Sequence, residues 1–340
     1  MSVVLVVLSC GAATTLQDGG RRGYLRYGLS ASGPMDCIAH AGANILVGNV
    51  ADASAIEFGL GGGRFRIEGG AVRLALAGAP CPIRLDGEPV AHHRSLVLRE
   101  GSELSIDRPR EGVFATLALA GGIAVEPVLS SASLHLRAAL GGLDGRPLHE
   151  GDRLPLAPPP LSGEPECCLD PVPIERDRPI RVVLGPQADR FTEAGIDTLL
   201  NAAFTVSNRA DRMGYQLDGP EIAHGLGGFN IVSDGTVAGA IQVPGSGRPI
   251  VLLADRQTTG GYPKIATVIS ADLRRLAQRR PGETVRFESI PLREAVRQAR
   301  ERAAAIAELP TRARLVADAP DRLLGANLAG NAVDAFDERD

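Results

Sequence analysis

Short runs of β-forming residues separated by glycine fill much of the first third of the chain and limit the folds it can adopt. Between Ala51 and Asp107 they cover residues 65–67, 72–76, 83–85, 95–98 and 104–106. Asp86-Gly87 is a strong hairpin signal. These runs show no strand–helix alternation of the kind that builds a parallel sheet, and closely spaced short strands are typical of a barrel or sandwich. The sequence therefore predicts a mainly β fold with a few helices.

The glycine clusters lack the features of nucleotide-binding loops. Gly61-Gly62-Gly63 is not followed by Gly-Lys-Ser/Thr, and no Gly-x-Gly-x-x-Gly stands between a predicted strand and a helix. We therefore predict a tight turn at Gly61–Gly63.

A proline-dense segment, residues 155–173, divides the chain. Proline cannot enter the interior of a sheet and suits an extended linker. With 340 residues, 44% of them hydrophobic, the chain can bury two cores. We predict four regions, namely a first domain over 1–157, a linker over 158–173, a second domain over 174–290, and a C-terminal helix and tail over 291–340.

Helices and further strands follow from the spacing of apolar residues. A helix is predicted over 36–47, with Asp36 as its cap, and a longer one over 291–309. The cap and helix dipole of the first would favour an anion, although an ordinary capped helix fits the sequence equally well. Strands are predicted over 2–11, 113–120, 180–184, 204–206, 240–243 and 250–254.

Charge and cysteine usage exclude several classes of protein. The formal net charge is −4 and no block of Lys or Arg occurs, which argues against nucleic-acid or membrane binding. The five cysteines and six histidines show no zinc-site spacing, so we expect no metal. No apolar segment is long enough to span a bilayer. We expect a cytoplasmic protein with reduced thiols.

The most polar loop of the second half lies between two apolar runs, over residues 255–265. It contains Asp255, then Gln257-Thr258-Thr259-Gly260-Gly261-Tyr262-Pro263, and then Lys264, the only lysine of the chain. Lysine is a point charge whose pKa responds to burial, whereas arginine is a fixed fork. A lysine kept where every other basic residue is arginine indicates a functional loop, although a chance survivor on a solvated turn would look the same.

All four tyrosines, Tyr24, Tyr27, Tyr215 and Tyr262, stand next to or near glycine in three polar loops. Arg212-Met213-Gly214-Tyr215 echoes Arg21-Arg22-Gly23-Tyr24, which hints at duplicated domains. A tyrosine offers both a ring and a hydroxyl to a ligand. We predict that the three loops form one composite site. Aromatic packing over bare backbone is the alternative for any single Gly-Tyr pair.

Several of these blocks together resemble the biotin-dependent carboxyltransferase domain family, also called allophanate hydrolase subunit 2, which includes the C subunit of bacterial ATP-dependent 5-oxoprolinase. The resemblance covers roughly residues 3–290. It is carried by Thr14-Thr15-Leu16-Gln17-Asp18, Ser32-Gly33-Pro34-Met35-Asp36, Ala43-Asn44, Gly185-Pro186-Gln187, Asp211-Arg212-Met213-Gly214-Tyr215, Gly239-Ala240-Ile241-Gln242-Val243-Pro244 and the 255–265 loop. A second arginine, Arg22, follows the expected Gly20-Arg21 and departs from the pattern.

The resemblance implies two cyclophilin-like β-barrel domains, related by duplication, with the site between them. It also implies partners, namely a companion subunit of similar fold and a metal-dependent amidase-like subunit. The chain has no Met-Lys-Met site for biotin attachment and no ATP-binding motif. It is therefore expected to be one subunit of a complex and inactive alone, with no covalent cofactor of its own.

Three functions are consistent with the resemblance. In the first, the complex couples ATP hydrolysis to opening of the lactam of 5-oxoproline, and this subunit helps to bind and activate the substrate. In the second, the subunit moves a carboxyl group from carboxybiotin to urea or a related amide. In the third, it is a non-enzymatic regulatory module that antagonises a kinase-inhibitor protein.

Both enzymatic functions need donors for a developing amide oxyanion and a group that manages a proton. The candidate catalytic residues are Arg21, Arg212, Lys264, Asp255 and Asp36. The candidate residues for binding a small amide or lactam are Gln17, Tyr24, Ser32, Asn44, Tyr215, Gln242, Gln257, Thr258, Thr259 and Tyr262. Buried Asp–Arg pairs that only hold a barrel together would look identical in sequence.

Overall fold

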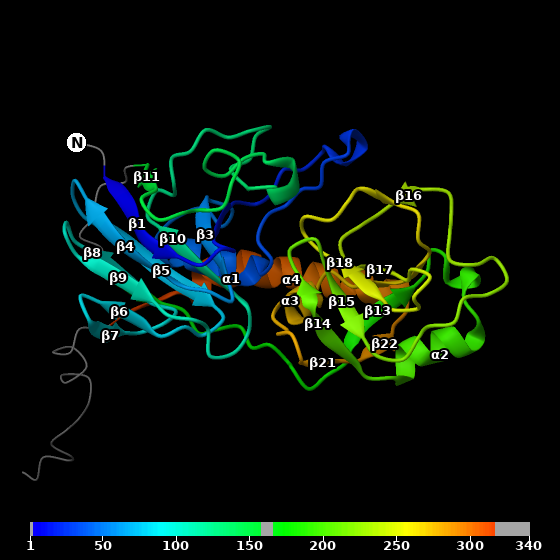
Figure 1. Cartoon of the computed structure of the whole chain (residues 1–340). Coiled ribbons are helices and arrows are strands. Elements are labelled where there is room, and N and C mark those ends of the chain that lie inside the picture. The colour runs from blue at the N-terminus through cyan, green and yellow to red at the C-terminus, as the bar shows by residue number, and fades with distance from the viewer. Residues whose placement is uncertain (1–2, 158–165, 317–340) are drawn as a thin grey trace, which may run out of the picture.

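The computed structural model describes residues 3–157 and 166–316 of the chain. Within these ranges it contains four α-helices, three short 3-10 helices and a large number of short strands. Figure 1 shows two β-rich halves side by side, the first in blue to cyan-green and the second in green to yellow. The predicted mainly β fold is confirmed.

Two antiparallel sheets build the first half. The six-stranded sheet has the order β11 (Arg153–Pro155), β1 (Val4–Cys10), β4 (Gly63–Glu68), β9 (Glu103–Ile106), β6 (Ile83–Leu85) and β7 (Glu88–Val90). The five-stranded sheet has the order β2 (Thr15–Gln17), β3 (Ala55–Gly59), β10 (Phe114–Leu119), β5 (Val72–Gly78) and β8 (Ser95–Leu98). Asp86 and Gly87 form the predicted hairpin turn between β6 and β7.

The burial pattern of each strand follows from what covers its two faces. Buried and exposed residues alternate along β4, because one face of its sheet meets solvent. All six residues of β10 are buried, since α1 (Cys37–Leu46) packs on β10 and β5 from the other side. The helix begins as predicted, with the Asp36 carboxylate accepting a hydrogen bond from the Ala39 N–H at 3.0 Å.

One eight-stranded sheet forms the second half. Its order is β21 (Thr284–Val285), β14 (Phe204–Ala210), β15 (Gly214–Asp218), β18 (Ile250–Leu252), β17 (Ala240–Gln242), β20 (Lys264–Val268), β13 (Ile180–Leu184) and β22 (Phe287–Ser289). The two edge strands, β21 and β22, are separated in sequence only by Arg286, so the sheet curls into a nearly closed barrel. The helix α2 (Glu193–Asn201) packs against β22, and α3 (Leu273–Ala277) follows β20.

Short elements complete the structure. Two small two-stranded sheets pair β12 (Cys167–Cys168) with β23 (Arg314–Leu315), and β16 (Asp234–Gly235) with β19 (Thr259–Gly260). The 3-10 helices are η1 (Leu25–Tyr27), η2 (Leu136–Ala138) and η3 (Ala188–Arg190).

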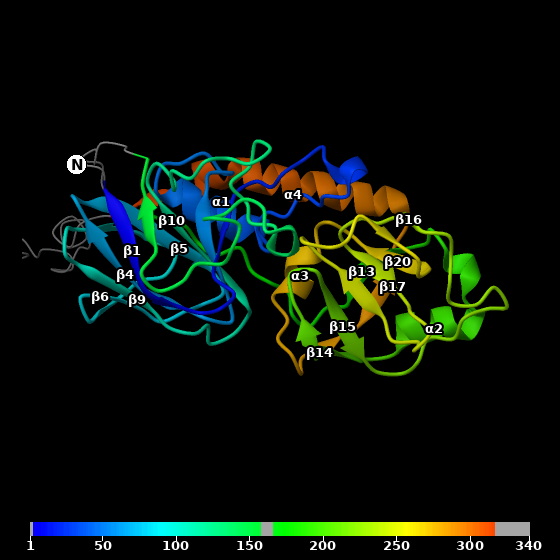
Figure 2. The same cartoon turned by 45° about the horizontal axis from the view of Figure 1, so that its top comes forward.

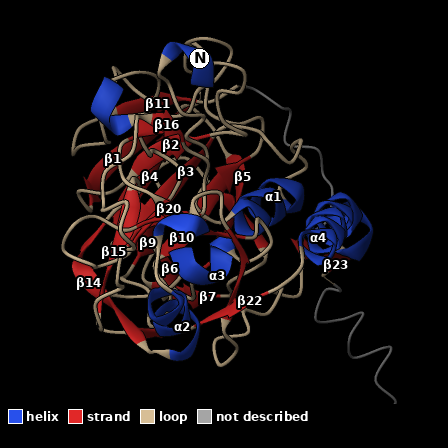
Figure 3. Ribbon diagram, turned by 90° about the vertical axis from the view of Figure 1, so that its right-hand side faces the viewer, coloured by secondary structure: helices blue, strands red, loops and turns tan. Residues whose placement is uncertain are grey.

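The long helix α4 (Leu292–Arg312) runs along both halves, as Figure 2 shows. It contacts β13 of the second half and α1 of the first, and Figure 3 shows α1 and α4 side by side. Leu309, near its end, is fully buried in the core of the first half. The predicted helix is confirmed and extends three residues beyond 309. Neither α4 nor any other described helix combines the length and hydropathy of a membrane span.

The predicted linker lies partly outside the described residues, which omit 158–165. Its described part does not form a free connection. Leu169 is 5% exposed and joins the first core, and β12 pairs with β23. These contacts bind residues 167–169 to the first half. The four domain boundaries stay a prediction.

The two halves interlock through buried groups. The side-chain carbonyl of Gln278 accepts hydrogen bonds from the N–H groups of Val113 and Phe114, at 2.7 and 2.9 Å. Its amide donates to the Asp36 carboxylate and the Phe114 carbonyl, at 3.0 and 2.8 Å. Met35, Val113 and Phe114 pack in the core of the second half. All four hydrogen-bonding positions of the Gln278 amide are therefore filled across the boundary.

The structure also corrects part of the sequence interpretation. The segment 21–24 is a loop between β2 and η1, whereas 212–215 forms the turn of the β14–β15 hairpin and enters β15. The two similar tetrapeptides thus occupy different positions in their halves. The short strands β2, β3, β7 and β11 and the helix α2 were not predicted. The turn at Gly61–Gly63 is tight, since a Cβ on Gly62 would lie 1.9 Å from the Ile106 carbonyl oxygen.

Candidate functional site

A cavity of about 180 Å³ lies between the two halves. Phe114 lines it from the first half, and Met213 from the hairpin turn of the second. Arg212 and Asp255, both predicted site residues, also line it. Apolar walls with a few convergent polar groups, at a domain boundary, are typical of small-molecule sites.

The guanidinium of Arg212 is the centre of a buried cluster that joins the halves. Its Nε and Nη2 donate to the two carboxylate oxygens of Asp255 at 2.9 and 3.1 Å. The Nη2 group also donates to the Gly33 carbonyl at 2.7 Å, and Nη1 donates to the carboxylate of Glu57. Gly33 and Glu57 belong to the first half. We call Gly33, Glu57, Arg212 and Asp255 the interdomain cluster.

Glu57 is a member of this cluster that the sequence analysis missed. It is 1% exposed in the middle of β3, and its second carboxylate oxygen accepts the Met35 N–H at 2.7 Å. Burial raises the pKa of Glu57 to about 7, although Arg212 and the Met35 N–H act in the opposite direction. A signal was present, because Glu57 is the only charged residue in the apolar run Ala55-Ile56-Glu57-Phe58.

Arg212 stays charged within this cluster. Burial alone would lower the pKa of Arg212, but the charges of Asp255 and Glu57 raise it above its ordinary value. Because Nε, Nη1 and Nη2 all donate to protein acceptors, the guanidinium has little capacity left for a substrate. We therefore assign Arg212 and Asp255 first to holding the two halves in place.

The side chain of Arg21 bonds to backbone carbonyl groups of a second loop. Its Nε donates to the Val128 carbonyl at 2.8 Å, and its Nη2 donates to the carbonyls of Ser131 and Ser133 at 3.2 and 2.9 Å. It is 1% exposed, and burial lowers its pKa. The nearby Asp18 accepts from both serine hydroxyls at 2.6 Å. Arg21 therefore fixes the 128–133 loop against the 18–21 loop.

Lys264 belongs to a second network, at the start of β20. It is 2% exposed, and its Nζ donates to the Asp234 carboxylate at 2.8 Å. The Gln187 side chain donates to the same carboxylate at 3.0 Å and accepts the Lys264 N–H at 3.1 Å. We call Gln187, Asp234 and Lys264 the lysine cluster. None of its described hydrogen bonds or ion pairs involves Arg21 or Arg212.

The 255–264 segment connects the interdomain cluster to the lysine cluster. Gln257, two residues after Asp255, donates to the side-chain carbonyl of Gln242 at 3.0 Å. Gln242 pairs with Lys264 across β17 and β20, and its amide donates to the Tyr262 carbonyl at 3.4 Å. The loop is thus ordered by its own predicted site residues. A single composite site around Arg21, Arg212 and Lys264 stays a prediction.

Several predicted site residues make contacts that account for them structurally. Asp36 caps α1 and pairs with Arg274 at 3.1 Å, and the Tyr215 hydroxyl donates to the Ala277 carbonyl at 2.7 Å. Asn44 bonds to the Ala53 carbonyl at 3.0 Å, and Gln17 accepts the Gly33 N–H at 3.1 Å. These side chains are buried and already satisfied.

The remaining predicted residues are more accessible. Tyr262 is 41% exposed, Thr259 is exposed in β19, and Thr258 and Tyr24 are half-buried. Ser32 is also half-buried, but its hydroxyl oxygen is enclosed and has no hydrogen-bond partner among the described residues. Tyr262 and Thr259 are therefore the predicted residues best exposed to an external ligand.

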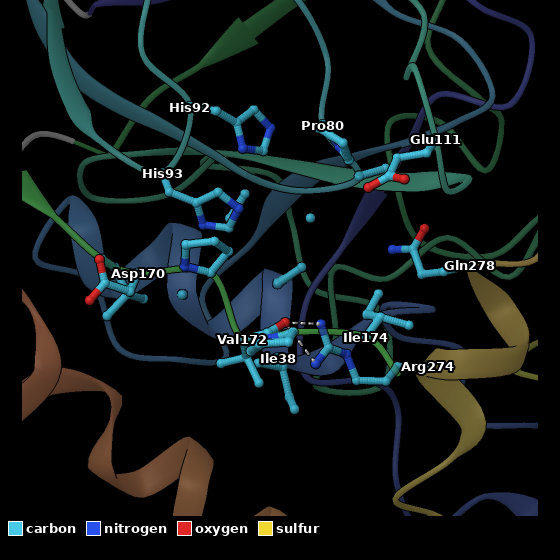
Figure 4. A pocket seen from close by; sticks show the side chains of 18 of the residues that line it. Ile38, Pro80, His92, His93, Glu111, Asp170, Val172, Ile174, Arg274 and Gln278 are labelled. Carbon is cyan, nitrogen blue, oxygen red and sulfur yellow. Dashed lines mark hydrogen bonds between the residues drawn. The ribbon is translucent and has the colours of Figure 1, made fainter. Parts of the chain in front are cut away.

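A larger cavity of about 990 Å³ lies beneath the 168–177 segment (Figure 4). His92 and His93 line one side, and Arg274 and Gln278 line another. Burial lowers the pKa of His92 to about 3, so its ring is neutral at physiological pH. Among the described residues, no group of three or more His, Cys, Asp or Glu is placed to hold a metal ion.

Comparison with known proteins identifies the class of this fold. The family model for the carboxyltransferase domain, subdomains A and B, matches residues 27–289. The chain therefore belongs to the carboxyltransferase domain family, which confirms the resemblance derived from its motifs.

Individual relatives show which proteins of known name the chain is similar to. The C subunit of 5-oxoprolinase from Escherichia coli (strain K12) is 38% identical over 299 residues, which span 86% of this chain and 94% of the relative. The C subunit of the Haemophilus influenzae 5-oxoprolinase is 37% identical over 297 residues. The urea amidolyase of Lachancea kluyveri is 31% identical over 307 residues, but this chain spans only 17% of it. The relatives are thus enzymes or subunits of enzymes.

Solved structures of similar proteins superpose on most of this chain. The crystal structure of TTHA0988 superposes with a TM-score of 0.77 at 37% identity, over 85% of this chain and 56% of that one. The K. lactis urea amidolyase superposes with a TM-score of 0.82 at 28% identity, over 94% of this chain and 20% of that one. This chain thus spans about half of the first protein and a fifth of the second.

The buried carboxyl of Glu57 gives a pH-dependent prediction. Because its folded pKa of about 7 lies above the ordinary 4.5, the folded state holds a proton that the unfolded state releases between these values. This stabilisation is complete below pH 4.5 and is lost as the pH rises through 7. We expect the unfolding free energy of the wild type, relative to Glu57→Gln, to fall by about 2–3 kcal/mol between pH 5 and 8.

Urea titrations of both proteins at four pH values in this range would measure the difference. Glu301→Gln, on the exposed face of α4, is the matched control and should track the wild type at every pH. Parallel curves for the wild type and Glu57→Gln would contradict the buried, protonated carboxyl.

Proposed function

We propose that this chain is the C subunit of a 5-oxoprolinase, in which it helps to bind and activate the lactam of 5-oxoproline for opening to glutamate. The observation that carries the proposal is the kinship with the C subunit of the Escherichia coli 5-oxoprolinase, which extends over 94% of that protein at 38% identity. An alignment of nearly full length supports a shared role better than a match to one domain of a larger enzyme.

Lys264 is the best-placed candidate donor for a developing oxyanion. An ammonium has three donors, and the described contacts of Nζ use one, on the exposed carboxylate of Asp234. Tyr262 and Thr259, which are exposed in the same loop, are the proposed recognition residues. Arg212 and Asp255 position this loop from inside, with Gln242 and Gln257 as the connection. Arg21, from the first half, holds the 128–133 loop through its carbonyls.

The proposed complex supplies what the chain lacks. ATP would be bound and hydrolysed by its partners, which we expect to be a companion subunit of similar fold and a metal-dependent amidase-like subunit. The isolated chain would then bind substrate without turning it over. We expect the complex to work in the cytoplasm.

A second function, transfer of a carboxyl group from carboxybiotin to urea or a related amide, is supported by the similarity to urea amidolyases. The superposition on the K. lactis urea amidolyase covers 94% of this chain. The two functions differ in their partners, since carboxyl transfer needs a biotin carboxylase and a biotin carrier. A regulatory module without chemistry is the third alternative.

Reconstitution distinguishes the alternatives directly. The chain, purified together with the proteins encoded beside its gene, should hydrolyse ATP when 5-oxoproline is added and release glutamate. Urea should not stimulate ATP hydrolysis. Stimulation by urea that depends on a biotinylated partner would support carboxyl transfer instead, and a complex inert towards both would favour the regulatory module.

Lys264→Met tests the proposed donor, because methionine retains the apolar stem and removes the ammonium. We expect turnover of 5-oxoproline by the complex to fall roughly 100-fold, as for loss of one oxyanion donor. The thermal midpoint of the isolated chain should change little. Asp234→Asn keeps the ammonium and should retain most activity. Full activity of Lys264→Met would remove Lys264 from the site.

A further inference from the structure

A separate cavity of about 270 Å³ lies where the two halves meet α4. The first half contributes residues 31, 32, 34, 35, 37 and 38 to its wall, and the second half contributes residues 238, 253, 254, 256, 270, 273 and 274. Arg302 of α4 completes the wall. Three parts of the molecule that are far apart in sequence thus enclose one space.

Arg256 lines this cavity and has no counter-ion among the residues that the structure describes. It is 7% exposed, and no carboxylate among the described residues lies within ion-pair distance of it. Within the described part of the chain its Nε has no hydrogen-bond partner, and Nη1 makes only a long contact of 3.4 Å with the Leu253 carbonyl. Burial, acting alone, lowers the pKa of Arg256. An unpaired buried charge destabilises the folded state, so we expect this guanidinium to bind an anion.

The other polar groups around the cavity are also suited to an anion. The hydroxyl oxygen of Ser32 is enclosed and has no hydrogen-bond partner in residues 3–157 and 166–316. Arg302 lies beside the Cys37 thiol and donates to the Ser270 carbonyl at 3.4 Å, whereas Arg274 is engaged with Asp36 at 3.1 Å. No Asp or Glu is among the described residues that line the cavity. The space therefore carries an excess of positive charge and two unused hydrogen-bonding groups.

Arg212 provides an internal comparison. It is buried to a similar extent, at 8% exposed, yet it faces two carboxylates and a carbonyl. The charge of Arg212 is thus neutralised by carboxylates of the chain itself. Arg256, four residues beyond the strand β18, has no carboxylate partner among the described residues. The difference indicates that the partner of Arg256 comes from outside the described residues, as a bound anion would.

We propose that this cavity binds a small oxyanion, a carboxylate or a phosphate, through Arg256 and Ser32, with Arg302 adding charge from α4. A guanidinium binds either group through two parallel hydrogen bonds. The identity of the anion, though not the site, rests on the proposed function. 5-Oxoproline carries a carboxylate and urea does not, so an oxyanion site here favours the lactam acid as the ligand.

Binding to the isolated full-length chain tests the site without the complex. Isothermal titration calorimetry would use three probes, namely 5-oxoproline, its neutral carboxamide, and inorganic phosphate. We expect at least one of the two anions to bind, the carboxamide to bind at least 10-fold more weakly than 5-oxoproline, and Arg256→Gln to weaken anion binding at least 10-fold. Arg293→Gln, which removes an exposed arginine of α4, is the matched control and should bind as the wild type does.

A thermal melt separates loss of binding from loss of folding. In buffer without small oxyanions Arg256→Gln should melt at or above the wild-type temperature, because it removes an unpaired buried charge. Stabilisation by the binding anion should disappear in this variant and weaken in Ser32→Ala. Equal binding by the wild type and Arg256→Gln, or no binding of either anion, would overturn the proposal.

The two sources of the anion are distinguished by the same titrations. Binding of phosphate that depends on Arg256, without binding of 5-oxoproline, would assign an inorganic or organic phosphate.

In the reconstituted complex, a carboxylate site predicts that Arg256→Gln raises KM for 5-oxoproline more than it lowers kcat. If Arg256→Gln changes neither the KM of the complex for 5-oxoproline nor anion binding by the isolated chain, the oxyanion site is refuted. The proposed function would still stand. A complex inactive on 5-oxoproline would refute the function, and calorimetry would still decide the site.

Discussion

The buried guanidinium of Arg212 is the interaction on which the arrangement of the two halves depends. Removing a guanidinium from water costs several kcal/mol, and this cost is offset only when its hydrogen-bonding groups are well satisfied. Asp255 supplies a bidentate carboxylate from the second half, while Glu57 and the Gly33 carbonyl complete the shell from the first. The halves therefore cannot separate without leaving a charge uncompensated.

The same cluster determines where the candidate ligand-binding groups lie. Ser32 precedes Gly33, whose carbonyl accepts from Arg212, and Arg256 follows Asp255. The lysine cluster is reached through Gln257 and Gln242 from the same segment. A change in the separation of the halves would thus alter both the oxyanion cavity and the loop of Lys264. Structural residues at the boundary and proposed ligand-binding residues beside them form one connected unit.

Local patterns predicted most of the regular structure, because they depend on neighbouring residues. Asp36 as a helix cap, the strand over 180–184 and the long C-terminal helix all follow from spacing and capping. The strand with Glu57 was missed because an acid within an apolar run is unsuited to burial until its partner, 155 residues away, is known. Arg256 was missed for the opposite reason, since the absence of a partner is visible only in three dimensions.

Motif resemblance identified the family, but it did not separate residues that hold the fold from residues that can meet a substrate. Tyr215, Asn44 and Asp36 carry motif positions and are fully engaged inside the protein. Lys264 and Tyr262 carry motif positions and retain free donors or exposed surface. Only the contacts of each side chain make this distinction, because polar residues of similar motifs, tyrosine among them, occur in both groups.

Differential scanning calorimetry of Arg212→Met tests the central role of the interdomain cluster most directly. Methionine fills part of the same volume but leaves Asp255 and Glu57 without their shared cation. The wild type should unfold in one cooperative transition. Arg212→Met should unfold at a lower temperature and in two separated transitions, because the halves lose their coupling. A single transition at the wild-type temperature in Arg212→Met would contradict this role.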